Sequence, residues 1–201
     1  ASTDQTQAVL DQLTRLPGIP LRVLRHSHNR GTGAAIRTGL AGATGDLVLI
    51  QDADLEYDPA DYTALLKPFE NPDVQAVYGS RNLRRNPRSN AAFYWGGRLL
   101  SVAANVIYGS QLTDIATGYK VMRTDLLRSL PLTANGFEFC EEVTALLLRR
   151  RVSIHEVPIS YAPRTRAEGK KIRARDGLTA IATLLRLRFQ PIGDKRRSSR
   201  P

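Results

Sequence analysis

Residues 47–59 read LVLIQDADLEYDP, a candidate strand that runs directly into a candidate ligand site. The four apolar residues 47–50 have the length and composition of a buried β-strand. They are followed by two carboxylates, Asp52 and Asp54, which project to the same side in an extended backbone. Adjacent carboxylates repel each other unless a cation lies between them, and hard oxygen ligands suit Mg²⁺ or Mn²⁺. A solvated acidic loop would explain an isolated D-x-D, but the end of a strand is where parallel α/β sheets bind ligands. The stretch therefore predicts a divalent metal site.

Short strand-like runs alternate with longer helical patterns along the chain. This alternation predicts an α/β fold with a Rossmann-like, mostly parallel sheet flanked by helices. Strands are predicted over residues 21–24, 47–50, 74–78, 119–122 and 152–161. Helices are predicted over residues 6–16, 33–40, 93–108, 125–130, 138–148 and 176–189, with a further helix beginning at Pro59. We expect one domain over residues 1–190 and a basic, disordered tail over residues 191–201.

The charge of the chain is concentrated near its C-terminal end. The 201 residues carry 29 Lys and Arg against 19 Asp and Glu, a net charge of +10. Residues 158–201 alone carry 12 basic and 3 acidic side chains, which is nearly the whole excess. This segment is therefore a candidate surface for an anionic partner: a phosphate ligand, a nucleic acid or an acidic membrane.

The helix expected over residues 176–189 has an apolar face flanked by Arg175, Arg186 and Arg188. Such a helix can lie in the headgroup layer of an anionic membrane. Packing against the core is an equally good interpretation, because a buried helix has the same spacing. No apolar run approaches the roughly 18–20 residues that span a bilayer, and Cys140, the single cysteine, cannot form an internal disulfide.

Two other classes of binding protein fit the sequence less well. Gly31 and Gly33 suit a dinucleotide-binding G-x-G-x-x-G, but Ile36 stands where the third glycine is required. The charge of +10 suits a basic nucleic-acid-binding protein, but aromatic residues make up only 6% of the chain and no nucleic-acid module is recognised. We therefore expect no nucleic-acid partner.

Several segments, in the same order, resemble motifs of family 2 glycosyltransferases. The resemblance is to the polyprenyl-phosphate sugar transferases, typified by dolichyl-phosphate mannosyltransferase. QDADLEYDP resembles the D-x-D segment of the family, and HNRGTGAAIRTGL resembles its N-x-G-K-G-x-A run with Thr32 in place of Lys. The other similar segments are STDQT at residues 2–6, YGSRN, WGGRLLSVAANVIYG, DIATGYKVMR, GFEFCEEVTALLLRR and EVPISYAPRTRAEGKK.

The resemblance implies a GT-A fold, a nucleotide-sugar donor, inversion at the sugar carbon and Mg²⁺ or Mn²⁺ held by Asp52 and Asp54. The donor-binding residues that it implies are Asp4, Asn29, Gly33, Asp52, Ala53, Asp54, Glu56, Arg81 and Arg98. Glu56 departs from the Gln that is common in relatives. The catalytic residues would be Asp54, Arg81 and Glu142. Surface salt bridges are the alternative role for Arg81 and Arg98, and helix capping is the alternative for Glu142. Asp114, Lys120 and Arg123 are weaker candidates.

A lipid monophosphate acceptor is also implied by the resemblance. Such a phosphate is largely dianionic at neutral pH, so it needs cations beside it rather than a strong base. The cations available are Arg164, Arg166, Lys170, Lys171 and Arg173. The expected function is hexose transfer from GDP-mannose or a UDP-hexose to a polyprenyl or dolichyl phosphate, at the cytoplasmic face of a membrane. A saccharide hydroxyl acceptor, with Glu142 as base, and an inactive relative remain alternatives.

The resemblance also includes a first strand and a leading pair of aspartates that have no match in this chain. We therefore expect an N-terminally incomplete domain, with weakened donor binding and an exposed sheet edge. The sugar, the nucleotide base, the choice of metal and the oligomeric state are left open by the sequence.

Overall fold

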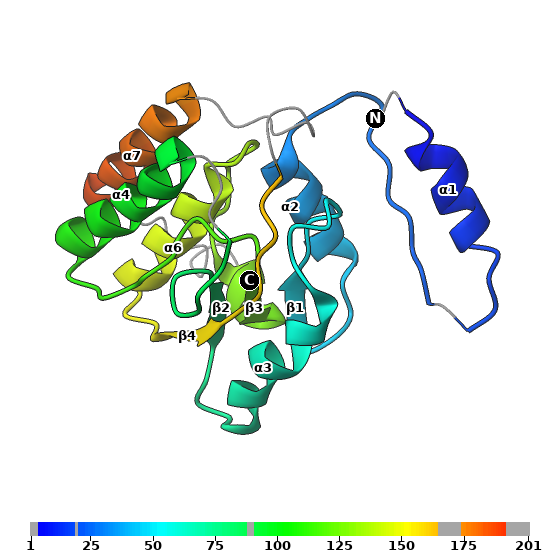
Figure 1. Cartoon of the computed structure of the whole chain (residues 1–201), viewed down its shortest axis with the longest axis horizontal. Coiled ribbons are helices and arrows are strands. Elements are labelled where there is room, and N and C mark those ends of the chain that lie inside the picture. Colours follow the sequence, from blue (N-terminus) through cyan, green and yellow to red (C-terminus); the bar gives the residue numbers. More distant parts are fainter. Residues whose placement is uncertain (1–3, 19, 88–90, 165–173, 192–201) are drawn as a thin grey trace, which may run out of the picture.

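Four strands form one mixed sheet in the order β1-β3-β2-β4 (Figure 1). The computed structural model describes residues 4–18, 20–87, 91–164 and 174–191. The strands are β1 (Leu47–Ile50), β2 (Ala76–Ser80), β3 (Lys120–Arg123) and β4 (Ile154–Pro158). β2 and β4 pair in parallel, whereas β3 runs antiparallel to both β1 and β2. Three of these four strands therefore run in the same direction, with β3 reversed between two of them.

The helices alternate with the strands, as the sequence pattern predicts. They are α1 (Thr6–Leu13), α2 (Thr32–Gly42), α3 (Tyr62–Leu66), α4 (Ala91–Tyr108), α5 (Thr124–Ser129), α6 (Phe139–Arg149) and α7 (Ala174–Phe189). Two short 3-10 turns, Pro59–Asp61 and Lys67–Glu70, flank α3. The α/β class is confirmed, and each predicted helix overlaps an observed one. The tail predicted over residues 191–201 lies outside the described residues, except for residue 191.

One predicted strand is wrong, and the pairing of the sheet is more mixed than predicted. Residues 21–24 do not form a strand: Leu21 and Leu24 are exposed, and the segment has no ladder partner in the described part of the chain. A β-type composition specifies a strand only where a neighbouring edge and a packed face are present. The sheet is also less parallel than predicted, because the loop before β3 already lies at the carboxyl end of the sheet. β3 must therefore run back across it.

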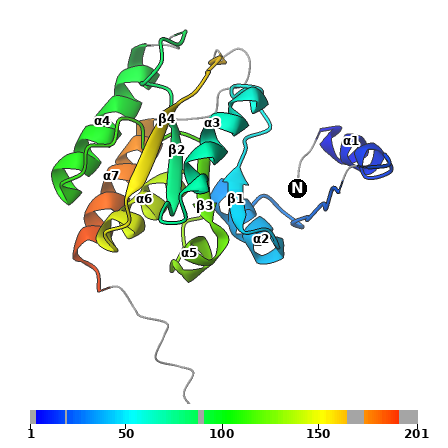
Figure 2. The same cartoon turned by 90° about the horizontal axis from the view of Figure 1, so that it is seen from below.

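Side chains of the strands alternate between two apolar layers. Ala76, Tyr78 and Met122 belong to the larger core, which α2 and α4 to α7 cover. Val77 and Val121 belong to the smaller core, which includes Leu65 of α3. Figure 2 shows α3 on one side of the sheet and α2, α5 and α6 on the other. The fold is thus a three-layer sandwich whose sheet is covered on both faces.

Helix α7 packs with one face and exposes the other. Leu184 and Leu187 are buried against the core, and the hydroxyl of Tyr108 in α4 donates a hydrogen bond to the Leu184 carbonyl at 2.7 Å. Leu185 and Phe189, on the other side, are exposed. Core packing therefore accounts for only part of the apolar face predicted for this helix, and the rest is open to solvent.

Helix α1 stands apart from the rest of the molecule (Figure 1). None of its described residues is buried, and Val9 and Leu13 are exposed. Its side chains include Asp11, which pairs with Arg25 in the segment that leads to α2.

Neighbouring leucines of α7 provide a matched test of this packing. We predict that Leu184→Ala lowers the free energy of unfolding by about 2–5 kcal/mol, because Leu184 is fully buried and its truncation leaves a cavity. Leu185→Ala, at a position 45% exposed, should cost less than about 1 kcal/mol. Denaturant unfolding followed by circular dichroism measures both. Equal losses for the two variants would show that α7 does not pack as described.

Candidate functional site

A cavity of about 1320 Å³ lies beyond the carboxyl ends of β1, β2 and β4. Its walls come from the loops that follow these strands, from the loop that precedes β3, and from residues of α4, α6 and α7. Because three strands end at this edge, segments far apart in the sequence meet there. This is the place where open α/β sheets bind their ligands.

The acidic loop after β1 forms one wall of the cavity. Asp52, Ala53, Asp54 and Glu56 all line it. Leu55 has a φ of 62° and its side chain is 89% exposed, a backbone conformation that is uncommon for a residue other than glycine. This turn lets the Glu56 N–H donate to Asp54 Oδ1 at 3.2 Å. Strained backbone of this kind is often found at functional sites, and here it directs both carboxylates toward one space.

Asp52 is held close to two groups that affect its charge. Burial raises the pKa of its carboxyl above the usual value, and the Asp54 carboxylate raises it further, whereas Lys120 lowers it. Gly118 approaches so closely that a Cβ there would lie 2.4 Å from Asp52 Oδ2. The Gly118 N–H also donates to the hydroxyl of Tyr57 at 2.8 Å. Any side chain at this position would require the Asp52 carboxylate to move.

Lys120 is a buried cation that lines the cavity close to the acidic loop. Its ammonium group donates to the carbonyls of Ile115 and Thr117 and lies 4.4 Å from the centre of the Tyr78 ring. The position follows from the sheet register, which pairs Lys120 directly with Tyr78. Lys120 therefore fixes the loop that carries Asp114 and Gly118.

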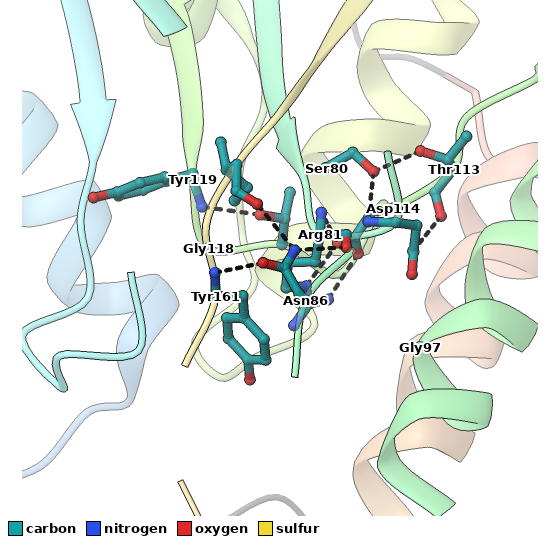
Figure 3. A network of polar contacts seen from close by, with 12 residues as sticks. Ser80, Arg81, Asn86, Gly97, Thr113, Asp114, Gly118, Tyr119 and Tyr161 are labelled. Carbon is teal, nitrogen blue, oxygen red and sulfur yellow. Dashed lines mark hydrogen bonds and ion pairs between the residues drawn. The ribbon is translucent and has the colours of Figure 1, made fainter. Parts of the chain in front are cut away.

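Arg81 and Asp114 form a two-point ion pair at the end of β2 (Figure 3). Arg81 Nε donates to Asp114 Oδ2 at 2.6 Å and Nη2 donates to Oδ1 at 2.7 Å. Asp114 is 1% exposed, and the guanidinium also lies 5.1 Å from the centre of the Tyr161 ring. The pairing orients Arg81, which lines the cavity.

A second set of hydrogen bonds supports this ion pair. The Glu156 carboxylate of β4 accepts from the N–H groups of Thr113 and Asp114 at 2.7 and 2.9 Å. The Asn86 amide donates to the carbonyls of Arg81 and Ile159, each at 2.9 Å. Sequence reasoning missed both residues. A carboxylate on a strand and an asparagine in a loop are common on surfaces, and only the tertiary fold reveals their partners.

The two neighbouring glutamates of α6 have different surroundings. Glu142 is fully buried, and its carboxylate accepts from the N–H and hydroxyl of Thr133 and from the N–H of Ala134, at 2.6–3.0 Å. The structure does not place it on the cavity wall. Glu141 does line the cavity, and burial raises its pKa to about 7 although Lys120 opposes the shift. Adjacent helix positions face about 100° apart, and the sequence alone does not say which one faces the cavity.

Three of the residues expected to bind the donor do not line the cavity. Asp4 accepts hydrogen bonds from Thr6 at the start of α1, away from the cavity. Asn29 accepts from the Gly31 N–H at 2.9 Å and shapes the entry to α2. Gly33 is buried against the chain at Ala134, so closely that a Cβ there would lie 2.5 Å from the Ala134 carbonyl oxygen. All three have local structural partners that the motif match did not reveal.

Some of the cationic residues expected to bind phosphate lie in the described part of the chain, and the others lie outside it. Arg98 of α4 and Arg164 both line the cavity. Arg164 contacts the acidic loop directly, with Nη2 2.6 Å from Asp54 Oδ2 and Nε 3.3 Å from Glu56 Oε1. Arg166, Lys170, Lys171 and Arg173 lie outside the described residues.

The acidic loop fits a divalent ion that a substrate would help to coordinate. Among the described residues, no group of three or more His, Cys, Asp or Glu side chains could hold a metal ion by itself. Mg²⁺, however, is often bound by one or two carboxylates together with substrate phosphates. The loop already attracts a cation, because the guanidinium of Arg164 contacts Asp54. Asp52 and Asp54 are thus the residues that could hold a metal here.

Comparisons with known proteins identify the family and the fold that this chain resembles. A profile of the family described as glycosyl transferase family 2 matches residues 1–130. The dolichol-phosphate mannosyltransferase of Pyrococcus furiosus is 27% identical over 157 residues, covering 75% of this chain and 43% of the relative. The undecaprenyl-phosphate mannosyltransferase of Micrococcus luteus is 30% identical over 161 residues, covering 75% and 64%. The chain thus spans less than two thirds of the length of these two curated relatives.

The solved structures that are similar confirm the fold. Glucosyl-3-phosphoglycerate synthase from Mycobacterium tuberculosis in complex with UDP is 22% identical, with a TM-score of 0.66 over 95% of this chain and 67% of that chain. Its complex with Mn²⁺, UDP-glucose and phosphoglyceric acid is 24% identical with a TM-score of 0.65, at the same coverage. The predicted GT-A fold is therefore confirmed.

Gly118 provides a test of the acidic loop that leaves its charges unchanged. We predict that Gly118→Ala weakens Mn²⁺ binding about 10- to 100-fold, because the new methyl group must displace the Asp52 carboxylate. Gly39→Ala is the control, since a Cβ there meets nothing within 4 Å. Electron paramagnetic resonance of free Mn²⁺ measures the affinity, and circular dichroism checks the fold. Wild-type affinity in a folded Gly118→Ala protein would show that Asp52 is not a ligand.

Proposed function

Because the chain belongs to glycosyl transferase family 2 and has the GT-A fold, we propose that it transfers a hexose from a nucleotide-sugar to a polyprenyl or dolichyl monophosphate. GDP-mannose and UDP-hexoses are the candidate donors, and the reaction inverts the sugar carbon C1. One observation carries this proposal: the acidic pair, Arg81, Arg98 and Arg164 line a single cavity at the carboxyl edge of the sheet. Such a cavity suits two phosphorylated substrates.

Donor binding is assigned to the acidic loop and to Arg81. A divalent ion bound by Asp52 and Asp54 would neutralise charge that develops on the departing nucleoside diphosphate. Arg81 adds a guanidinium that Asp114 holds in one orientation. Preorganised cations of this kind stabilise a transition state without needing to rearrange during the reaction.

Acceptor binding is assigned to Arg98 and Arg164, which line the cavity. An acceptor phosphate oxygen forms the new bond to C1, while the bond from C1 to the donor diphosphate breaks and its electrons leave with the diphosphate. A monophosphate near pH 7 is largely dianionic, so no proton has to be removed from it. The cations bring it beside a donor that is also negatively charged. The names of the two mannosyltransferase relatives support an acceptor of this class.

A hydroxyl acceptor is the second candidate, and Glu141 is the observation that favours it. This carboxylate lies on the cavity wall with its pKa raised by burial to about 7, which suits a general base near neutral pH. The structural neighbour bound to UDP-glucose and phosphoglyceric acid supports a small phosphorylated acceptor in the same way. Glu141, rather than Glu142, would then accept the hydroxyl proton.

A matrix of donors and acceptors tests both candidates. We predict that transfer occurs from GDP-mannose or a UDP-hexose to a short polyprenyl monophosphate, with Mg²⁺ or Mn²⁺ present, and that Asp54→Asn lowers the rate at least about 100-fold. Product formation is followed by mass spectrometry, with Asp73→Asn as a control on an exposed turn. Transfer to 3-phosphoglycerate or a saccharide alone would favour the second candidate. Full turnover by Asp54→Asn or in excess chelator would contradict the metal role.

The exposed apolar faces of α4 and α7, from which Leu99 and Leu178 also line the cavity, are suited to a membrane surface. In the described part of the chain, no helix has both the length and the apolar character needed to cross a bilayer. Exposed apolar side chains nevertheless form one stripe on each of these two packed helices. They are Trp95, Leu99, Val102 and Val106 of α4 and Leu178, Leu185 and Phe189 of α7. Arg186 and Arg188 are exposed beside them, and exposed cations suit peripheral binding to anionic lipid. Binding through this face would bring the cavity close to a lipid acceptor.

Trp95, the only tryptophan, reports on this surface directly. We predict that its fluorescence shifts to shorter wavelength when anionic vesicles are added at low salt, because its exposed ring enters the headgroup layer. Val106→Glu with Phe189→Glu should abolish the shift, whereas Val9→Glu on α1 should leave it unchanged. An emission spectrum that vesicles do not alter would remove the membrane proposal.

A further inference from the structure

The guanidinium of Arg164 contacts the acidic loop where the proposed function places a divalent ion. Its Nη2 lies 2.6 Å from Asp54 Oδ2 and its Nε lies 3.3 Å from Glu56 Oε1. Its backbone N–H also donates to Glu56 Oε1 at 3.0 Å. One arginine therefore contacts two carboxylates of a loop to which the proposed function assigns a divalent metal.

Further contacts join the segment around Arg164 to the same loop. The Tyr161 hydroxyl donates to Glu56 Oε2 at 2.6 Å, and the Ala162 N–H donates to the Glu56 carbonyl at 2.9 Å. The Ser160 N–H donates to Asp61 Oδ2 at 2.7 Å. These bonds are centred on Glu56 and Asp61, so they hold residues 160–164 near the acidic loop without using Asp54. Asp54 is contacted by the guanidinium of Arg164 itself.

A guanidinium and a divalent ion would compete for Asp54. Both are cations and both would take the same carboxylate oxygen, so they repel each other at this distance. The side chains of Arg164 and Asp54 are 35% and 24% exposed, and partly exposed ion pairs are weak enough to be displaced. The guanidinium can leave while the backbone bonds of residues 160–164 remain, because it is at the end of a long and flexible side chain.

We propose that Arg164 is the internal counter-cation of the metal site, that a divalent ion displaces it from Asp54, and that the displaced guanidinium then binds a phosphate of the substrate. The second half of this inference rests on the proposed function. The exchange gives the reaction an order: the metal enters before the phosphate group that Arg164 holds. Arg164 thus pairs with Asp54 before the metal binds and with a substrate phosphate afterwards.

Titration with Mn²⁺ alone tests the competition, since it needs no substrate. Electron paramagnetic resonance at low salt should show that Arg164→Gln binds Mn²⁺ about two- to fivefold more tightly than the wild type, because the competing cation is gone. Arg164→Lys should fall between them, and the difference should shrink as salt screens the pair. Arg84→Gln is the matched control, because Arg84 lines the same cavity but donates to the Ser160 hydroxyl. Equal or weaker Mn²⁺ binding by a folded Arg164→Gln, or no binding by the wild type, overturns the exchange.

Calorimetry with a short polyprenyl monophosphate in saturating Mg²⁺ tests the second half. Arg164→Gln should bind this probe about tenfold or more weakly, as expected for the loss of a charged hydrogen bond, and Arg84→Gln should bind it like the wild type. Unchanged affinity in Arg164→Gln overturns the phosphate role. Tighter Mn²⁺ binding by Arg164→Gln, in a protein that transfers no sugar, would support the exchange while the proposed function fails.

Discussion

Repulsion among the carboxylates of Asp52, Asp54 and Glu56 is the constraint on which the rest of the site depends. Three carboxylates within five residues repel each other, and nearby positive charge reduces that repulsion. The fold supplies that charge from two segments: the buried Lys120 lowers the pKa of Asp52, which burial raises, and Arg164 contacts Asp54 from a position 110 residues further along the chain. The loop therefore has cationic partners on two sides.

The same edge of the sheet holds a second charged unit, and the two are linked. The loop that precedes β3 carries Asp114, which orients Arg81, and also Gly118, which leaves room for Asp52. Lys120 fixes this loop through the carbonyls of Ile115 and Thr117. A single segment thus sets the position of both the acidic and the basic side of the cavity. This explains why β3 has to begin at the carboxyl edge and run against its neighbours.

The sequence was sufficient where the information is local. The apolar run over residues 47–50 followed by two acids predicted both the strand and the place of the cavity, because alternation and strand ends follow from the covalent geometry. It was insufficient where partners are distant. Arg81 and Asp114 are 33 residues apart, and nothing in either neighbourhood indicates a buried ion pair. The choice between Glu141 and Glu142 depends on how α6 is rotated against the loop at Thr133, which is a property of packing. Residues 21–24 have a β-type composition but no neighbouring strand edge to pair with, so the strand predicted there does not form.

We propose that a divalent ion binds between Asp52 and Asp54 and replaces the Arg164 guanidinium. Crystals grown with Mn²⁺ and a nucleoside diphosphate, measured at a wavelength where manganese scatters anomalously, test it most directly. We predict an anomalous peak within coordination distance of the two aspartates, with Arg164 turned away from Asp54. A peak elsewhere, or no peak while Arg164 still contacts Asp54, would contradict it.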